Sequence, residues 1–268
     1  MAICRSLCVA HAQARTEGVM YTMFTPFIRA VRLRRDEIED WSEYPFSLPV
    51  VRALDEIDLS APITFLCGEN GSGKSTLLEA IAIACGMNPE GGSRNMRFSS
   101  RDTHSPLHMH MTCVRGARRE RDGFFLRAES MYNVASEIDR LEEDMHGILR
   151  SYGGDSLHGQ SHGESFLSVI QHRFGARGLY VLDEPEAPLS PARQLTLMCE
   201  LDRLTRAGSQ LIIATHSAML MAMPGARIYS LDEHGISQVG YEDTEHFRIS
   251  RAFFTDPERM LRMLLDGD

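Results

Sequence analysis

Apolar residues occur along this chain in short, nearly unbroken runs that alternate with segments of helical spacing. The runs predicted to be strands are residues 27–33, 63–67, 124–126, 179–182, 210–214 and 227–231. Strands with so few polar positions are typical of a parallel sheet that is buried on both faces. The segments predicted to be helices are residues 74–85, 131–149, 165–174, 191–205 and 257–265. Because strands and helices alternate, the sequence predicts an α/β fold with a parallel core sheet.

The ends of these patterns predict the domain organisation. Residues 1–22 follow neither pattern, and we expect them to be a disordered leader before a single domain at 23–268. Their apolar stretch is too short and broken for a secretion signal. Within the domain we expect a core lobe from 23–90 and 178–268, and an inserted, mostly helical subdomain at 91–177. The turn at 233–235 is typical of a hairpin.

Composition narrows the class of protein. No apolar run approaches the roughly 20 residues that cross a bilayer. The six cysteines show neither metal-site spacing nor a disulfide framework, which favours a reducing cytoplasm. A net charge of −9 argues against a protein that coats nucleic acid without specificity.

One motif carries clear chemistry. After the strand predicted at 63–67, residues 68–75 read Gly-Glu-Asn-Gly-Ser-Gly-Lys-Ser and open a predicted helix, which is the context that a P-loop requires. Backbone N–H groups of such a loop cradle nucleotide phosphates. The residues expected to bind nucleotide are Gly68, Glu69, Asn70, Gly71, Ser72, Gly73, Lys74, Ser75 and Thr76.

Lysine usage supports a special role for one of these residues. Of 28 basic residues, Lys74 is the only lysine. A compact ammonium fits between phosphate oxygens where a planar guanidinium does not. We therefore expect Lys74 to contact the β- and γ-phosphates, and Ser75 to ligate Mg²⁺.

Two further predicted strands end in polar residues that complete a phosphate site. The strand at 179–182 runs into Asp183 and Glu184, and the strand at 210–214 runs into Thr215 and His216. Ligands bind at the carboxyl ends of parallel strands. Asp183 is therefore expected to hold Mg²⁺, Glu184 to act as general base toward water, and His216 to contact the γ-phosphate.

In this order the three motifs resemble those of the ABC-type ATPases. That resemblance implies ATP hydrolysis with Mg²⁺, and catalytic roles for Lys74, Glu184 and His216. The family's signature turn lies about 20 residues before the Asp-Glu pair, where this chain has Ser161, Gly163 and Glu164. The resemblance implies that these three contact ATP bound to a second subunit, so that ATP binding closes a head-to-tail homodimer.

The chain departs from the family pattern in several places. His162 and Glu164 replace a glycine and a glutamine of the signature, and residues 187–190 lack the family's aspartate. No glutamine lies between Ser75 and Gly159, and Glu129 is the candidate for the missing Q-loop residue. Trp41 and Tyr44, upstream of the P-loop, could stack on adenine or pack on the sheet edge.

A narrower resemblance is to bacterial stand-alone ATPases labelled AAA family ATPase, similar to a RecF/SMC-like head without the coiled coil. It is carried by residues 123–130, 160–166 and 241–246, and it covers about residues 25–268. The helix predicted at 131–149 is too short for the coiled-coil arm of chromosome-organising ATPases.

A segment rich in arginine is relevant to which macromolecule the protein binds. Residues 94–127 contain eight arginines against Asp102, Glu120 and Asp122. Such a patch could bind nucleic acid, in maintenance or anti-phage defence, or its charges could pair with the acidic body of the protein. The alternatives are an ATP switch that controls an effector protein and, third, the ATPase subunit of a transporter. The eight arginines are Arg94, Arg97, Arg101, Arg115, Arg118, Arg119, Arg121 and Arg127.

Overall fold

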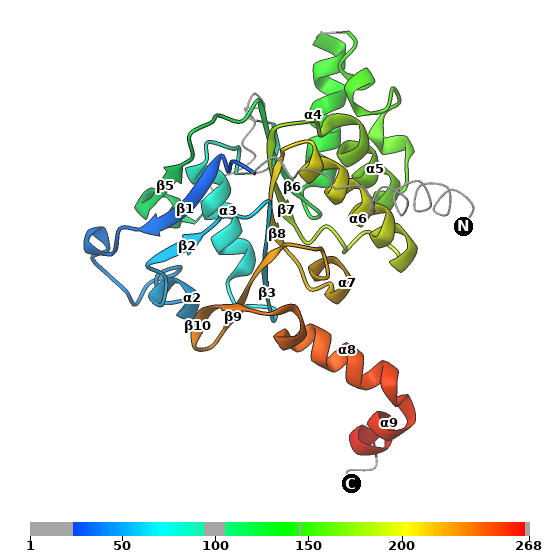
Figure 1. The fold of residues 1–268 in the computed structure, drawn as a ribbon. Helices are drawn as coiled ribbons and strands as arrows, with labels where there is room; N and C mark the ends of the chain where they lie inside the picture. The colour runs from blue at the N-terminus through cyan, green and yellow to red at the C-terminus, as the bar shows by residue number, and fades with distance from the viewer. Residues whose placement is uncertain (1–23, 90, 94–104, 145, 266–268) are drawn as a thin grey trace.

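A computed structural model of the protein describes residues 24–89, 91–93, 105–144 and 146–265. Its centre is a sheet of seven strands within these residues (Figure 1). The strands are β3 (Ile63–Gly68), β4 (Gly92–Ser93), β6 (Asp122–Arg127), β7 (Gly178–Asp183), β8 (Gln210–Ala214), β9 (Arg227–Asp232) and β10 (Gly235–Val239). Their order is β10-β9-β3-β8-β7-β6-β4, with a parallel centre and an antiparallel strand at each edge.

The central strands are apolar because both faces of the sheet are covered. Every residue of β3, β7 and β8 is buried. Side chains alternate between two cores, since successive residues of a strand point to opposite faces. Phe65 lies in one core and Leu66 in the other, and Leu182 and Val181 divide in the same way. The short apolar runs of the sequence therefore correspond to strands that are buried on both faces of the sheet.

Helices cover the two faces. One core contains α4 (Met131–Asp144), α5 (His162–Ser168), α6 (Pro191–Arg206) and α7 (Ala218–Met221). The other contains α2 (Pro49–Arg52) and α3 (Lys74–Ala84), together with a small antiparallel sheet (Figure 1). That sheet has the order β2-β1-β5, formed by β2 (Glu56–Asp58), β1 (Ile28–Leu33) and β5 (Met111–Arg115).

A buried glutamine joins the small sheet to the central sheet. Gln210, at the start of β8, is fully buried. Its side-chain oxygen accepts hydrogen bonds from the backbone N–H groups of Phe27 (2.8 Å) and Ile28 (3.0 Å). Its amide nitrogen donates to the carbonyl groups of Ile28 (2.8 Å) and Leu59. One side chain thus satisfies four backbone groups between the sheets.

The predicted α/β fold with a parallel core is confirmed, and most predicted elements are present. The hairpin at 233–235 joins β9 to β10. Two helices differ from prediction: α4 ends at Asp144, and the helix predicted at 165–174 is α5 followed by a π-helical turn, Val169–Arg173. α5 begins earlier because Glu164 bonds back to the backbone N–H of Ser161 (3.1 Å), which forms a helix cap.

The predicted boundary of the inserted subdomain needs correction. Within 91–177, β4 and β6 belong to the central sheet and β5 belongs to the small sheet. β6 pairs in parallel with β7 over its full length, from Asp122 beside Gly178 to Arg127 beside Asp183. This pairing places residues 122–127 in the central sheet, so the predicted insert at 91–177 includes strands of both sheets. The predicted leader, 1–22, lies outside the described residues.

The chain leaves the core through two C-terminal helices. α9 (Pro257–Leu265) was predicted, and α8 (Glu245–Thr255) was missed because its pattern is broken by arginines. Neither helix has a buried residue, and together they project from the domain (Figure 1). The first turn of α8 contacts the segment that follows β8, through His246 and His216.

Candidate active site

The P-loop follows β3 and leads into α3, as predicted. Gly68 has φ +150°, and a Cβ there would lie 2.1 Å from the carbonyl oxygen of Leu231. Gly73 has φ +91°, and its Cβ would lie 2.7 Å from a methyl of Val50. Positive φ, together with a backbone contact at Gly68 and side-chain contact at Gly73, therefore favours glycine at both positions. The loop presents N–H groups at the positive end of the α3 dipole, which is a phosphate-binding arrangement.

Lys74 lies inside this loop. Its side chain donates to the carbonyl oxygen of Glu69 (2.8 Å), and the residue is buried. Burial lowers the pKa of its ammonium, and the nearby carboxylates of Glu184 and Asp183 oppose that shift. Lys74 is thus a cation placed between the phosphate loop and two acidic residues.

Ser75 and Asp183 meet beside the lysine. The Ser75 hydroxyl donates to Oδ1 of Asp183 (3.1 Å), although the residues are far apart in sequence. Burial raises the pKa of Asp183 to about 6, against the lowering effects of Arg127 and Ser75. A hydroxyl and a buried carboxylate form a hard-oxygen pair of the kind that Mg²⁺ prefers, and a cation would offset the cost of burying the charge. These two side chains fit the predicted metal role.

Arg127 is a residue that sequence reasoning placed elsewhere. It ends β6, and its guanidinium donates to Glu79 of α3 (2.6 Å) while Nε lies 3.4 Å from Oδ2 of Asp183. The parallel pairing of β6 and β7 puts Arg127 directly beside Asp183. A cation here keeps the Asp183 side chain oriented on the β7 end. No local sequence signal pointed to this contact.

Glu184 adopts an uncommon backbone conformation. Its φ is +48°, in the left-handed region that residues other than glycine rarely adopt. The turn is held by its backbone N–H, which donates to the carbonyl of Ala214 at the end of β8 (2.9 Å). Backbone strain of this kind is concentrated at functional sites. Here it turns the carboxylate toward β8, where Oε1 lies 3.4 Å from Nε2 of His216.

His216 follows β8 and completes the predicted set. Its backbone N–H donates to Oε1 of Glu186 (2.5 Å), a residue that sequence analysis missed. Burial raises the pKa of Glu186, and burial together with Lys74 lowers the pKa of the His216 imidazole. β3, β8 and β7 are neighbours, so their carboxyl ends bring Lys74, His216 and Glu184 to one edge of the sheet.

The signature turn caps α5, on the helical face. Ser161 donates to Glu164 (2.6 Å) and accepts from Arg193 of α6 (3.4 Å). Glu164 also pairs with Arg193 (2.9 Å), and these hydrogen bonds lower the pKa of its carboxyl. A Cβ on Gly163 would lie 2.6 Å from the carbonyl oxygen of Pro188. Within the described residues, these contacts join the turn to α6 and 188–189 and include no member of the P-loop.

Three weaker sequence candidates have distinct environments. Glu129 is exposed just after β6, and its charge contributes to the raised pKa of Asp183. The Tyr44 hydroxyl shares a hydrogen bond with Thr76 of α3 (2.9 Å), while its ring is largely exposed. Trp41 packs under the guanidinium of Arg35 at 4.5 Å. Of the two aromatic candidates, Tyr44 is therefore the one beside the P-loop.

The basic segment divides into paired and exposed charges. Arg115 pairs with Glu120 of the same segment (2.9 Å), whereas Arg127 pairs with Glu79 in the body of the protein (2.6 Å). Arg118, Arg119 and Arg121 are exposed in the turn between β5 and β6. Three of the arginines lie outside the described residues; they are Arg94, Arg97 and Arg101.

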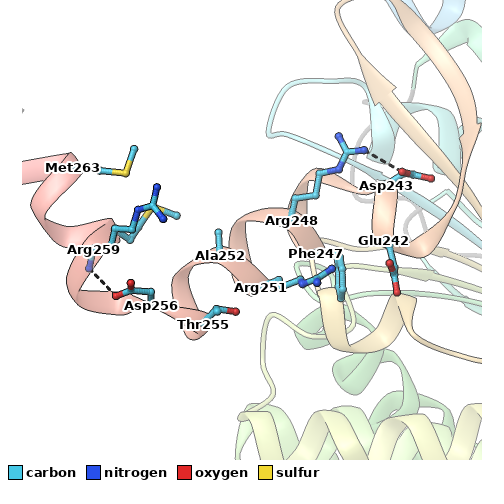
Figure 2. A pocket seen from close by; sticks show the side chains of 11 residues that line it. Glu242, Asp243, Phe247, Arg248, Arg251, Ala252, Thr255, Asp256, Arg259 and Met263 are labelled. Carbon is cyan, nitrogen blue, oxygen red and sulfur yellow. Dashed lines mark hydrogen bonds and ion pairs between the residues drawn. The ribbon is translucent and has the colours of Figure 1, made fainter. Parts of the chain in front are cut away.

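A groove on the C-terminal helices lies apart from this chemistry. It has a volume of about 690 Å³ and is lined by residues of α8, α9 and the turn before α8, among them Phe247, Arg251 and Met260. Figure 2 shows Arg248 paired with Asp243 at its rim. No P-loop residue lines it, so the candidate active site is the sheet edge and not this groove.

Two protein-family models match parts of the chain. Residues 47–134 match the family described as "AAA domain", and residues 163–222 match "AAA domain, putative AbiEii toxin, Type IV TA system". The first match contains the P-loop, and the second contains the Asp183–Glu184 pair and His216. None of the described helices is both long enough and apolar enough to cross a membrane.

Individual relatives include ATP-binding proteins named for sugar import and for cell division. The chain is 26% identical to the "Xylose import ATP-binding protein XylG" of Moorella thermoacetica over 67% of its own length and 39% of that protein. It is 27% identical to the "Cell division ATP-binding protein FtsE" of Mycobacterium tuberculosis, over 67% of this chain and 84% of that one. The chain thus spans about two fifths of the xylose import protein.

Solved structures are similar to this chain only at low identity and with low TM-scores. The "SMC head domain from Thermotoga maritima" is 16% identical, with a TM-score of 0.37 over 69% of this chain and 92% of that chain. The family matches contain the phosphate loop, the acidic pair and the histidine that the fold gathers at one sheet edge. The chain has a P-loop fold, and its residues 47–134 and 163–222 are similar in sequence to ATP-binding domains of the AAA/ABC type.

Proposed function

We propose that this protein hydrolyses ATP with Mg²⁺ at the edge formed by the ends of β3, β8 and β7. The proposal depends on two side-chain contacts that occur together at this edge of the sheet. Ser75 lies 3.1 Å from Asp183 in a metal-type pair, and Glu184 lies 3.4 Å from His216. Nucleotide binding needs only the P-loop, whereas a carboxylate turned toward a histidine is suited to activating water.

Each residue has a role that its surroundings support. Lys74 and the P-loop N–H groups would bind the β- and γ-phosphates, and Ser75 and Asp183 would hold Mg²⁺, which offsets phosphate charge. Glu184 would orient the attacking water and accept its proton. His216 would donate from Nε2 toward the γ-phosphate. Such positioning and charge stabilisation account for most of the catalysis in phosphoryl transfer.

We further propose that two chains bind ATP between them in a head-to-tail homodimer. The support is the location of Ser161, Gly163 and Glu164: their contacts in the chain involve α6 and 188–189, so the turn is presented by α5 rather than by the P-loop side. In this arrangement the turn of one chain completes the phosphate site of the other. We place this activity in the cytoplasm.

The test is the substitution Glu184→Gln, which keeps the shape and removes the base. We expect ATP binding to persist, kcat to fall at least 100-fold, and a dimer to accumulate in ATP. Steady-state hydrolysis and light scattering after size exclusion measure these effects. Glu242→Gln, at an exposed carboxylate on the C-terminal groove, is the control and should match the wild type.

Two outcomes would refute parts of this proposal. Unchanged hydrolysis by the Glu184→Gln variant would exclude Glu184 as the base. A variant that binds ATP and stays monomeric would exclude the shared site while leaving single-chain hydrolysis intact.

Nucleic acid is the partner that one observation favours. The turn between β5 and β6 exposes Arg118, Arg119 and Arg121, and none of the three forms an ion pair with another described residue, on a protein that is otherwise acidic. We expect DNA or RNA to bind there and the binding to weaken with salt. Changing the three arginines to glutamine should abolish salt-sensitive binding. If binding is absent in the wild type, an effector protein becomes the partner to seek.

A further inference from the structure

A second histidine lies directly behind His216. His246 belongs to the first turn of α8, and its Nε2 lies 3.2 Å from Nδ1 of His216. The ring centroids are 5.4 Å apart, with the planes inclined at 58°. This is a hydrogen-bond distance between two ring nitrogens, and it leaves Nε2 of His216 facing Glu184.

The position of His246 is fixed by the way α8 begins. Thr244 is buried and caps the helix, since its hydroxyl accepts from the N–H of Phe247 (3.3 Å) and donates to the carbonyl of Tyr241 (2.8 Å). The Phe247 and Tyr241 rings pack at 4.6 Å. Beyond this turn, no residue of α8 is buried. The start of α8 is therefore fixed by its cap and by the packing of the two rings, and this places His246 beside His216.

The pair of rings can share one hydrogen in only two ways. If His216 donates from Nδ1, its Nε2 carries a lone pair, which would face the carboxylate of Glu184 at 3.4 Å. If His246 donates from Nε2, Nδ1 of His216 accepts and Nε2 of His216 carries the hydrogen toward Glu184. Two acceptors repel each other, so the second arrangement is favoured.

The electrostatic surroundings keep both rings neutral, as the argument requires. Burial lowers the pKa of both imidazoles, and the ammonium of Lys74 lowers both further, although acidic neighbours oppose it. A neutral imidazole has one donor and one acceptor nitrogen, and the partner of one nitrogen decides the role of the other. Among the described residues, the buried Nε2 of His216 has Glu184 at 3.4 Å and no closer hydrogen-bond partner, so its hydrogen is available to a ligand.

We propose that His246 is a positioning residue, which holds His216 in the tautomer that presents Nε2–H to the phosphate site. The proposal rests on the proposed ATP hydrolysis for its kinetic consequence, but the tautomer itself is a property of the protein alone. His246 touches no reacting atom and acts through His216. The same contact ties the start of the C-terminal helices to the nucleotide site.

The direct test reads the tautomer without any turnover. In protein labelled with ¹⁵N-histidine, long-range ¹H–¹⁵N correlation spectra at neutral pH distinguish protonated from unprotonated ring nitrogens. We expect hydrogen on Nε2 of His216 in the wild type, and a measurable share of the Nδ1 tautomer in the His246→Leu variant, in which only the Glu184 carboxylate still disfavours that tautomer. Hydrogen on Nδ1 in the wild type, or an unchanged His216 spectrum in the variant, would overturn the proposal. Either result is independent of whether the protein hydrolyses ATP.

Kinetics then separates positioning from mere packing. Removing a partner that fixes an imidazole tautomer typically costs about 10- to 100-fold in activity, and we expect His246→Leu to lower kcat by that factor with little change in KM. His246→Gln retains an N–H donor and should recover most of kcat. The matched control is His234→Leu, in the exposed turn between β9 and β10, which should match the wild type.

A double-mutant cycle completes the test. In a His216→Ala background, His246→Leu should have no further effect, because the proposal routes all its influence through His216. Additive losses, or an equal loss in the Gln and Leu variants, would assign His246 a purely structural role. If the wild type shows no hydrolysis, the proposed function fails while the spectra still decide the tautomer.

Discussion

The buried carboxylate of Asp183, at the end of β7, is expected to lower the free energy of unfolding of the ligand-free protein. Asp183 is 5% exposed, and burial raises its pKa from the ordinary 3.8 to about 6. At about 1.36 kcal/mol for each tenfold change in acidity, keeping this carboxylate ionised costs about 3 kcal/mol of folding free energy. Asp183→Asn keeps the shape and removes the charge, so we expect the ligand-free variant to be more stable.

The sign of the effect fixes its pH dependence. The folded protein holds the Asp183 proton more tightly than the unfolded chain does, so the contribution to stability falls as pH rises from about 4 to about 6. The advantage of the variant should therefore be small at pH 4, grow up to pH 6 and stay constant above it. Because Arg127 loses its partner charge, we expect a net gain of about 1–3 kcal/mol at pH 7, or several degrees in Tm.

Urea unfolding between pH 4 and pH 8, without nucleotide or Mg²⁺, measures this gain. Asp155→Asn, at an exposed position, is the control and should change stability by less than about 0.5 kcal/mol. Mg²⁺ and ATP should stabilise the wild type more than the variant, since only the wild type retains the carboxylate ligand. A variant that is equally or less stable at pH 7, or a gain that does not depend on pH, would refute the burial argument.

Two further substitutions test how the fold is held together. Gln210→Leu should lower the free energy of unfolding by about 3 kcal/mol, because it leaves buried N–H and carbonyl groups without partners. Chemical unfolding compares it with Gln238→Leu, a change at an exposed site that should be nearly neutral. Gly163→Ala should lower the free energy of unfolding by about 1–3 kcal/mol, since its Cβ would lie 2.6 Å from the Pro188 carbonyl oxygen. Thermal unfolding compares it with Gly159→Ala, where a Cβ meets nothing within 4 Å, and equal stability of the two variants would contradict this geometry.

The sequence was sufficient for the elements whose chemistry is local. A P-loop is recognisable because one continuous segment supplies the strand, the glycines and the helix start. Asp183, Glu184 and His216 could be predicted for the same reason, since each directly follows an apolar strand. The alternation of strands and helices then fixed the α/β class, because burial on both faces leaves a continuous apolar run.

What the sequence could not supply are contacts between segments that are distant along the chain. Arg127 was counted in a basic patch, yet the parallel pairing of β6 with β7 places it on Asp183. The same pairing moved residues 122–127 from the predicted insert into the core, because a three-residue apolar run does not reveal which sheet it joins. His246 lies in the segment 241–246, to which the sequence assigns no chemical role, and the start of α8 places it beside His216. Local patterns specify elements and motif chemistry, whereas charge partners and tautomers depend on which strand ends and helix starts become neighbours, and only the tertiary structure decides that.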